Sequence, residues 1–179
     1  MKIAIAALLG ICSWSFLEYL IHRFLGHHPR FRPNPFATEH VRHHAEGDYF
    51  AATSKKAIAA LAFFALVTPL AVAVAGVAAG LAYAIGLVAM YVAYEVLHRR
   101  LHTHEGFGPY GRWARRHHFH HHFGNPKANH GVTSPIFDLL FGTYERVTTV
   151  RVPRKLAMRW LFDEHGDVRK SVAGVYSLR

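Results

Sequence analysis

The sequence has only one cysteine among its 179 residues, Cys12, and that cysteine lies within an apolar run. A single cysteine excludes an intrachain disulfide, and thiolates cannot assemble a metal site. Carboxylates are scarce too, with 11 Asp and Glu against 21 Lys and Arg. Any metal must therefore rely on histidine, with carboxylate in a minor part. The chain shows no internal repeat and no low-complexity linker, and its length is typical of a single domain, 1–179.

The charge is strongly unbalanced, at +10 with histidine counted as neutral. A basic protein can bind nucleic acid, but here Arg and Lys lie mainly beside and after the apolar runs. This distribution follows the positive-inside rule of membrane proteins. We therefore expect a membrane protein and no nucleic-acid partner.

The first apolar run, residues 3–21, has the length that crosses a bilayer. A cleaved signal peptide is the alternative, but no small-x-small cleavage site follows and the run continues directly into His22. The second apolar block, 57–97, is long enough for two crossings, predicted at 57–75 and 77–97. Gly76 and Gly80 provide a turn between them, and Pro69 is expected to kink the second span.

The orientation follows from charge. Basic residues after the first span outnumber Lys2 before it, and Lys55-Lys56 and Arg99-Arg100 flank the hairpin. The amino terminus is then outside and every histidine cluster is cytoplasmic. We predict an all-α integral membrane protein with three spans, one helix plus a helical hairpin, and a cytoplasmic helical cap whose histidine-rich region is 98–145. The apolar patch 135–141 is too short to span and is expected to dip into the interface; the tail after Arg146 carries no readable chemistry.

Histidine is abundant, with 16 residues, and most are clustered. Imidazole suits zinc, iron, copper and nickel. The clusters are His22-x4-His27, His40-x2-His43-His44, His98-x3-His102 and the tract His117-His118-Phe119-His120-His121-His122. Helical positions three and four apart share a face, so most clusters would project together, whereas His22 and His27 are expected to straddle a helix end. Ten histidines on four segments suit two metals held close together.

Simpler interpretations apply to some of these residues. A lone histidine such as His165 is an ordinary surface residue, and a dense tract standing alone can be an unstructured metal-binding run. Glu95 precedes His98 by three positions and resembles half of a carboxylate di-iron motif, but we expect it to orient a histidine rather than to bind metal. Glu18 receives the same interpretation relative to His22.

The four clusters in this order, around a membrane hairpin, resemble the fatty acid hydroxylase (sterol desaturase) superfamily. Three further stretches are similar to the membrane fatty acid and sphingolipid 2-hydroxylases, namely His121-His122-Phe123-Gly124-Asn125, Gly131-Val132-Thr133-Ser134 and Phe141-Gly142-Thr143. The resemblance covers roughly Glu18 to Tyr144.

The resemblance implies a histidine-rich dimetal centre whose ligands, matched motif by motif, are His22, His27, His40, His43, His44, His98, His102, His118, His121 and His122. The last tract also fits the frame His117, His120 and His121, and we choose the later frame because it directly precedes the Phe-Gly-Asn turn. His120 and His130 have no firm place in the pattern and are open as accessory ligands or supporting groups.

The resemblance also implies O2-dependent hydroxylation of a lipid acyl chain, at the carbon next to the carbonyl. Two metal ions are expected, iron in the active form because zinc has no redox chemistry, although zinc can occupy the site in a purified sample. Some relatives carry a fused cytochrome b5 domain, for which this chain is too short. The electrons are therefore expected from a separate donor, a cytochrome b5-like protein or a ferredoxin with its reductase.

Other functions remain as alternatives. Within the same superfamily these are a carotenoid or sterol hydroxylase, although the spacing His98-x3-His102 is tighter than in carotenoid hydroxylases. A non-enzymatic metal-binding or transport protein would place polar ligands at mid-bilayer, yet residues 57–94 contain no histidine and no carboxylate. A zinc hydrolase needs an open coordination position, which ten ligands would not leave. The aromatic residues near the clusters could line a path for an acyl chain, with ordinary packing as the alternative; they are Phe24, Phe31, Phe36, Tyr91, Tyr94, Phe119 and Phe123.

Overall fold

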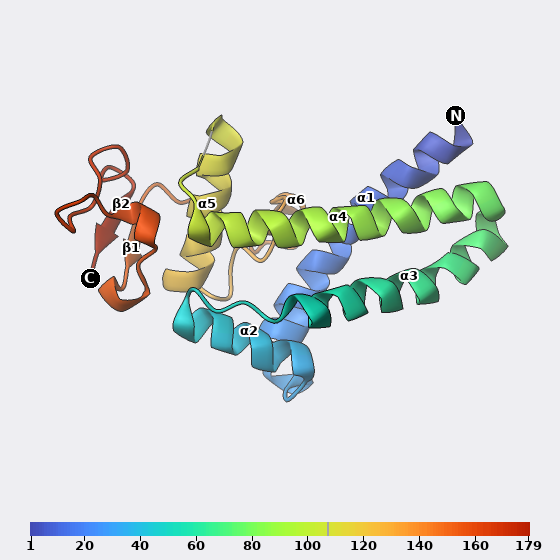
Figure 1. The fold of residues 1–179 in the computed structure, drawn as a ribbon, viewed down its shortest axis with the longest axis horizontal. Helices are drawn as coiled ribbons and strands as arrows, with labels where there is room; N and C mark the ends of the chain where they lie inside the picture. The colour runs from blue at the N-terminus through green and yellow to red at the C-terminus, as the bar shows by residue number, and fades with distance from the viewer. Residues whose placement is uncertain (107) are drawn as a thin grey trace. The chain divides into compact units, whose positions relative to one another are not determined.

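The computed structural model describes residues 1–106 and 108–179 and is mostly helical, as predicted (Figure 1). The helices are α1 (Lys2–Leu20), the π-helix η1 (Ile21–His27), α2 (Pro35–Glu46), α3 (Thr53–Ala75), α4 (Val77–Thr103), α5 (Gly108–Phe123) and α6 (Ile136–Leu140). Three short 3₁₀ turns lie at Pro29–Phe31, Arg154–Leu156 and Arg159–Leu161. A small parallel sheet of β1 (Val150–Val152) and β2 (Tyr176–Leu178), with one isolated bridge between Phe162 and Val168, adds to the predicted all-α class.

The chain divides into two compact units. The first, which we call the membrane unit, consists of residues 1–18 and 51–96. The second, which we call the histidine unit, consists of residues 19–50 and 97–179 and holds every histidine of the four clusters. Two helical segments, Lys2–His27 and Val77–Thr103, contribute residues to both units.

Three helices are long and apolar enough to cross a membrane, and the protein is an integral membrane protein. They are Lys2–His27, Thr53–Ala75 and Val77–Thr103, and they contain the predicted spans 3–21, 57–75 and 77–97. Two of them, Lys2–His27 and Val77–Thr103, continue beyond the apolar stretch into turns that carry histidines. No residue of α3 is buried inside the protein, as expected for a helix whose neighbour is lipid.

The membrane unit packs through small residues, which let helix backbones approach closely. A Cβ atom added at Gly10 of α1 would lie 2.1 Å from the Tyr83 carbonyl oxygen of α4, and one at Gly86 would lie 2.3 Å from the Ala7 carbonyl oxygen. Gly76 joins α3 to α4 with a φ of +80°, a conformation that side chains disfavour. The turn predicted between the second and third spans is therefore present.

Glu95 lies in the membrane unit and forms an ion pair with Lys56. This contact differs from the expectation that Glu95 orients a histidine ring. The physical reason is that an ammonium group satisfies a half-buried carboxylate more strongly than a neutral imidazole does.

The histidine unit owes its core to the tail, which the sequence pattern left without an assignment. Residues 150–178 form the two-stranded sheet and the last 3₁₀ turns, and these pack on α5. The core comprises Phe119, Phe123, Val150, Val152, Met158, Trp160, Leu161 and Tyr176. Trp160 also donates a hydrogen bond from Nε1 to the His102 carbonyl oxygen at 3.1 Å. The tail thus supports the ends of the two helices that carry the later histidines.

The apolar patch at 135–141 forms the short helix α6, and its sides differ sharply. Ile136, Leu139 and Leu140 are each more than half exposed, whereas Asp138 is fully buried. The patch is too short to cross a membrane, as predicted. One face of α6 therefore carries the buried Asp138, while the other leaves apolar side chains uncovered.

Candidate metal centre

His22 and His27 lie in the π-helix η1, which directly continues α1. A π-helix closes its hydrogen bonds between residues five apart, so residues i and i+5 share a face. His22 and His27 are five residues apart, whereas an α-helix places residues three or four apart on one face. The change from α-helix to π-helix therefore matches this spacing. The expectation that these histidines straddle a helix end is corrected in this respect: both lie within the same π-helix, and the chain leaves the helix only at His28.

Helix α2 carries the second cluster, and its ends are set by local sequence. The Asn34 side chain accepts a hydrogen bond from the Ala37 amide at 2.8 Å, Pro35 occupies the first turn, and Gly47 ends the helix with a φ of +74°. His40 and His43 are buried and His44 is half-buried. The remaining histidines of the clusters lie at the end of α4, His98 and His102, and in α5, His118, His121 and His122.

The ten histidines gather into two groups of five, both inside the histidine unit. The first histidine group is His22, His27, His40, His44 and His121, and the second histidine group is His43, His98, His102, His118 and His122. Within each group, one nitrogen from every ring lies within 4.8 Å of the others. Each group could hold a metal ion.

The two groups have the same construction. Each takes two histidines from a segment of its own, η1 for the first group and α4 for the second, and three from α2 and α5 together. Helix α2 gives two residues to the first group and one to the second, while α5 does the reverse. The groups are adjacent, because the rings of His44 and His122 stack with centroids 3.9 Å apart.

Backbone carbonyls fix the orientation of three of the rings. The Nδ1 atoms of His22, His43 and His121 lie 2.5 Å, 2.6 Å and 2.7 Å from the carbonyl oxygens of His130, Tyr49 and Ala128. A carbonyl oxygen can only accept, so each of these Nδ1 atoms carries the proton and each Nε2 atom presents a lone pair. This is the usual way in which a protein sets the tautomer of a metal-binding histidine.

The lone pairs converge without enough protons to pair them. His27 Nε2 lies 2.8 Å from His40 Nε2 and 2.9 Å from His121 Nε2, and His102 Nε2 lies 2.9 Å from His118 Nε2. Further nitrogens are buried with no hydrogen-bond partner among the described residues, namely Nε2 of His22 and His44, Nδ1 of His118 and both ring nitrogens of His122. Buried polar atoms without partners are costly, and cations at the two groups would satisfy them. The donor set therefore fits a pair of metal ions.

The electrostatics favour the neutral form that metal binding requires. Burial, reinforced by the neighbouring histidines, holds the pKa of His40, His118, His121 and His122 well below its usual value. The same causes lower the pKa of His44 to about 2. These rings are unprotonated at neutral pH, so their lone pairs are available to a cation.

The three histidines whose roles the sequence left open do not belong to either group. His117 Nε2 lies 3.3 Å from an Asp138 carboxylate oxygen, and His120 Nε2 lies 2.6 Å from Glu145. His130 is buried beside the first histidine group and contributes its carbonyl oxygen to His22. The structure thus places the later frame of the tract, His118, His121 and His122, among the converging donors.

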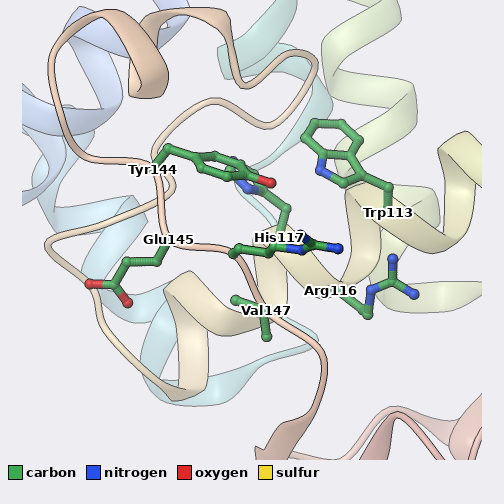
Figure 2. Close-up of a pocket in the computed structure, with 7 residues that line it drawn as sticks. Trp113, Arg116, His117, Tyr144, Glu145 and Val147 are labelled. Atoms are coloured by element: carbon green, nitrogen blue, oxygen red, sulfur yellow. The ribbon is translucent and has the colours of Figure 1, made fainter.

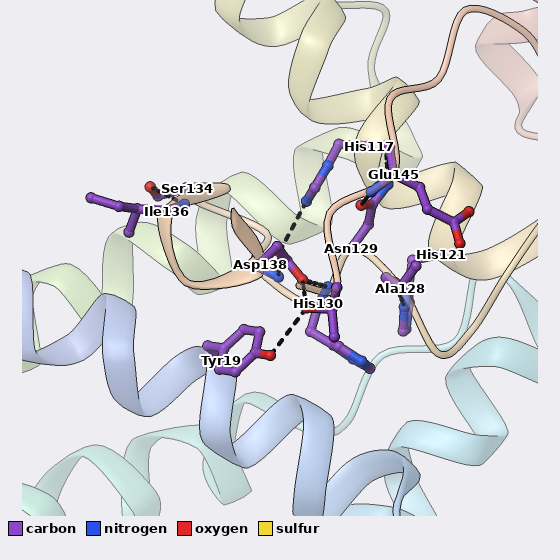
Figure 3. A network of polar contacts seen from close by, with 12 residues as sticks. Tyr19, His117, His121, Ala128, Asn129, His130, Ser134, Ile136, Asp138 and Glu145 are labelled. Atoms are coloured by element: carbon purple, nitrogen blue, oxygen red, sulfur yellow. Dashed lines mark hydrogen bonds and ion pairs between the residues drawn. The ribbon is translucent and has the colours of Figure 1, made fainter. Parts of the chain in front are cut away.

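Sequence reasoning missed Asp138, which organises the loop beside the first histidine group (Figure 3). Its carboxylate accepts hydrogen bonds from the amides of His130 and Gly131, both at 2.8 Å, from Thr143 Oγ1 at 2.7 Å and from His117. Burial alone would raise the pKa of Asp138, but these donors outweigh it and keep the pKa below its ordinary value. A lone acidic residue in the apolar run 135–141 was the one available signal.

Asp138 acts on the first histidine group through the backbone that it holds. The loop 128–131 supplies the carbonyl oxygens of Ala128 and His130, which orient His121 and His22. Figure 3 shows Asp138 between His117 and His130, with Tyr19 reaching the same network; the Tyr19 hydroxyl lies 3.0 Å from Thr143 Oγ1. Two rings of the first histidine group are therefore oriented by a loop that one carboxylate anchors.

Residues 7–143 match the sequence profile of a family described as fatty acid hydroxylase. The ceramide very long chain fatty acid hydroxylase of Saccharomyces cerevisiae is 33% identical over 148 residues, which are 75% of this chain and 36% of that protein. The fatty acid 2-hydroxylase of Rattus norvegicus is 33% identical over 150 residues, covering 75% and 38% of the two chains.

Two more comparisons agree with these. The dihydroceramide fatty acyl 2-hydroxylase of Arabidopsis thaliana is 28% identical over 151 residues, covering 82% of this chain and 62% of that protein. A solved structure of full-length scs7p, in which only the hydroxylase domain is visible, has a TM-score of 0.60 at 26% identity and covers 80% of this chain and 57% of that chain. This chain therefore spans less than two thirds of the length of each of these relatives.

We expect Asp138→Asn to destabilise the histidine unit, because an amide has one acceptor oxygen where the carboxylate receives four donors. The loss of a buried, hydrogen-bonded charge costs about 3 kcal/mol, so the thermal unfolding midpoint of the protein in detergent should fall. Glu46→Gln is the control: it makes the same chemical change in an exposed carboxylate paired with Arg42, and it should leave the midpoint unchanged. Equal midpoints for the two variants would show that Asp138 does not anchor the loop.

Proposed function

This chain belongs to the fatty acid hydroxylase family, and from that membership we propose that it is an O2-dependent oxidoreductase that hydroxylates a lipid acyl chain. The observation that carries the proposal is the pair of adjacent five-histidine groups inside the histidine unit. A site made only of neutral nitrogen donors, with its lone pairs facing inward, suits two redox-active divalent ions.

The proposed substrate is an acyl chain hydroxylated at the carbon next to its carbonyl group. The relatives support this choice, because those described above are named as fatty acid or ceramide hydroxylases and two as 2-hydroxylases. They favour an acyl substrate over a carotenoid or a sterol. We further propose that electrons come from a separate donor protein, since hydroxylation with O2 consumes two electrons beyond those of the substrate.

All ten clustered histidines are proposed as ligands of two iron ions. Bound iron would supply the redox chemistry that activates O2, which zinc lacks. The protein's own contribution is to keep the rings neutral through burial and to fix three of them through backbone carbonyls. It also keeps bulk water from the centre, because seven of the ten histidines are buried and the other three are only partly exposed.

The proposed orientation places the histidine unit in the cytoplasm and the amino terminus outside, as the charge asymmetry predicts. In this arrangement the exposed face of α6, with Ile136, Leu139 and Leu140, would lie in the interfacial layer of the bilayer. An acyl chain could then reach the metal centre from the membrane without passing through water.

The metal content tests the dimetal centre. Anaerobically purified protein should contain about two ions per chain, measured by plasma mass spectrometry. His44→Ala removes a donor from the first histidine group and His118→Ala one from the second, so each should reduce the content toward one ion. His165→Ala is the control and should retain two, because its exposed ring stands outside both groups. A wild-type content near one, with full activity, contradicts the proposal.

The source of the oxygen tests the reaction. Membranes containing the protein, supplied with a reductase system and an acyl lipid, should form hydroxylated product only when O2 is present. Mass spectrometry should find the label in the new hydroxyl group from ¹⁸O₂ and not from labelled water. Replacement of iron by zinc should stop product formation, since zinc cannot exchange electrons. Label from water would instead indicate hydration or hydrolysis and would refute the hydroxylase.

Labelling with a membrane-impermeant thiol reagent tests the orientation. In a Cys12→Ala background, cysteines placed at Lys2 and at Ala75, both exposed ends of spans, should react from outside intact cells. A cysteine at Lys170, exposed in the tail, should react only after the membrane is permeabilised. Labelling of the Lys170 position in intact cells would reverse the proposed topology.

A further inference from the structure

A pocket of about 230 Å³ opens on the histidine unit (Figure 2), and no histidine of the two groups lines it. It is lined by Trp113, Arg116, His117, Tyr144, Glu145, Arg146 and Val147. Helix α5 provides the first three of these residues, and the segment before β1 provides the others. Pockets for whole cofactors are larger, typically 300–1,000 Å³, so this one suits a single side chain of a partner protein.

The charge of the pocket is positive and uncompensated. The guanidinium groups of Arg116 and Arg146 make no hydrogen bond or ion pair with the residues that the structure describes. Glu145, the one acidic residue in the lining, is already engaged, because its carboxylate binds His120 Nε2 and Asn125 Nδ2, each at 2.6 Å. Figure 2 shows its carboxylate on the side opposite the Arg116 guanidinium. The pocket therefore presents two arginines to an incoming anion.

The floor of the pocket is connected to the metal centre by a continuous series of contacts. The Trp113 ring stacks on His117 with centroids 5.0 Å apart, and the Tyr144 ring stacks on its other side at 5.7 Å. His117 is buried and contacts Asp138, which binds the His130 amide, and the His130 carbonyl binds His22 of the first histidine group. His117 therefore links the two, because it lines the pocket and also belongs to the hydrogen-bond network of Asp138.

From this juxtaposition we infer that the pocket formed by Arg116, Arg146, Trp113 and Tyr144 is the docking site of a soluble one-electron carrier protein with an acidic face. The inference rests on the proposed function, which requires electrons from outside the chain. An Asp or Glu of the carrier would enter between the two guanidinium groups, which recognise carboxylates through paired hydrogen bonds. Each electron would pass from the reduced carrier along the series from Trp113 to His22 and would be taken up by the iron that the first histidine group would hold. The carrier would be oxidised and the iron reduced by one electron each.

The physical demands of such a complex match a small charged pocket. Electron-transfer complexes are transient and have small interfaces. Opposite charge brings the partners together quickly and makes binding sensitive to salt. A carrier that must leave after each electron is better served by two arginines at the surface than by a large apolar interface.

Binding and turnover with a plant-type [2Fe–2S] ferredoxin, an acidic one-electron carrier, test the inference on the full-length protein in detergent. The double variant Arg116→Glu and Arg146→Glu should raise the Kd at low ionic strength by about tenfold or more, and wild-type binding should weaken as salt increases. The matched control, Arg151→Glu with Lys170→Glu, makes the same change in charge at exposed positions elsewhere in the histidine unit. It should change the Kd by less than about threefold.

Turnover separates docking from catalysis. The pocket variant should lose hydroxylation driven by reduced ferredoxin but keep the rate driven by ascorbate with phenazine methosulfate, a small mediator that needs no docking site. The neutral double variant Arg116→Gln and Arg146→Gln should show a smaller loss of ferredoxin-driven hydroxylation. If the charge-reversal variant also loses metal, the result of the neutral variant is used in its place.

A Kd that is equal in the pocket and control variants, or that exceeds measurable concentrations already in the wild type, overturns the docking site. A wild-type protein that hydroxylates with neither reductant instead refutes the proposed function. The binding assay needs no turnover, so the two failures are distinguishable.

Discussion

The structure depends on keeping ten imidazole rings together, most of them buried, in the neutral form with their lone pairs directed inward. Such an arrangement is unfavourable alone, since ring nitrogens such as those of His27 and His40 approach to hydrogen-bond distance without enough protons to pair them all. Metal ions would convert this cost into binding free energy. Much of the surrounding architecture serves to hold the rings in place against their tendency to turn outward or take up protons.

Three kinds of support hold the rings. The helices set which histidines share a face, and the π-helix η1 does so for a spacing that an α-helix cannot match. Backbone carbonyls then fix the tautomer of His22, His43 and His121. Finally, Asp138 fixes the loop that carries two of these carbonyls, so one buried carboxylate acts on the centre without lying in it.

The tail and the pocket both involve α5, the helix that carries histidines of both groups. The tail packs its apolar residues against α5, the helix that contributes to both histidine groups. The same helix carries Trp113, Arg116 and His117, which line the pocket. One helix thus connects the core of the histidine unit, the donors of both groups and the surface where a partner is proposed to bind.

The sequence alone was enough for the membrane spans, the four clusters and the family, because each of these depends on local features: the length of an apolar run, the spacing of histidines on a helix and the order of motifs. Whether the clustered histidines bind metal, and on which side of the membrane, stays a prediction.

The tertiary structure decided how the histidines divide into two groups. His43 lies in a different group from its neighbours His40 and His44, and His117 turns to Asp138 instead of joining a group. Spacing along a helix assigns residues to a face, but the partner across that face comes from segments far away in the chain. The roles of Asp138, of the tail and of the arginine pocket arise in the same way, from contacts that local sequence patterns do not encode.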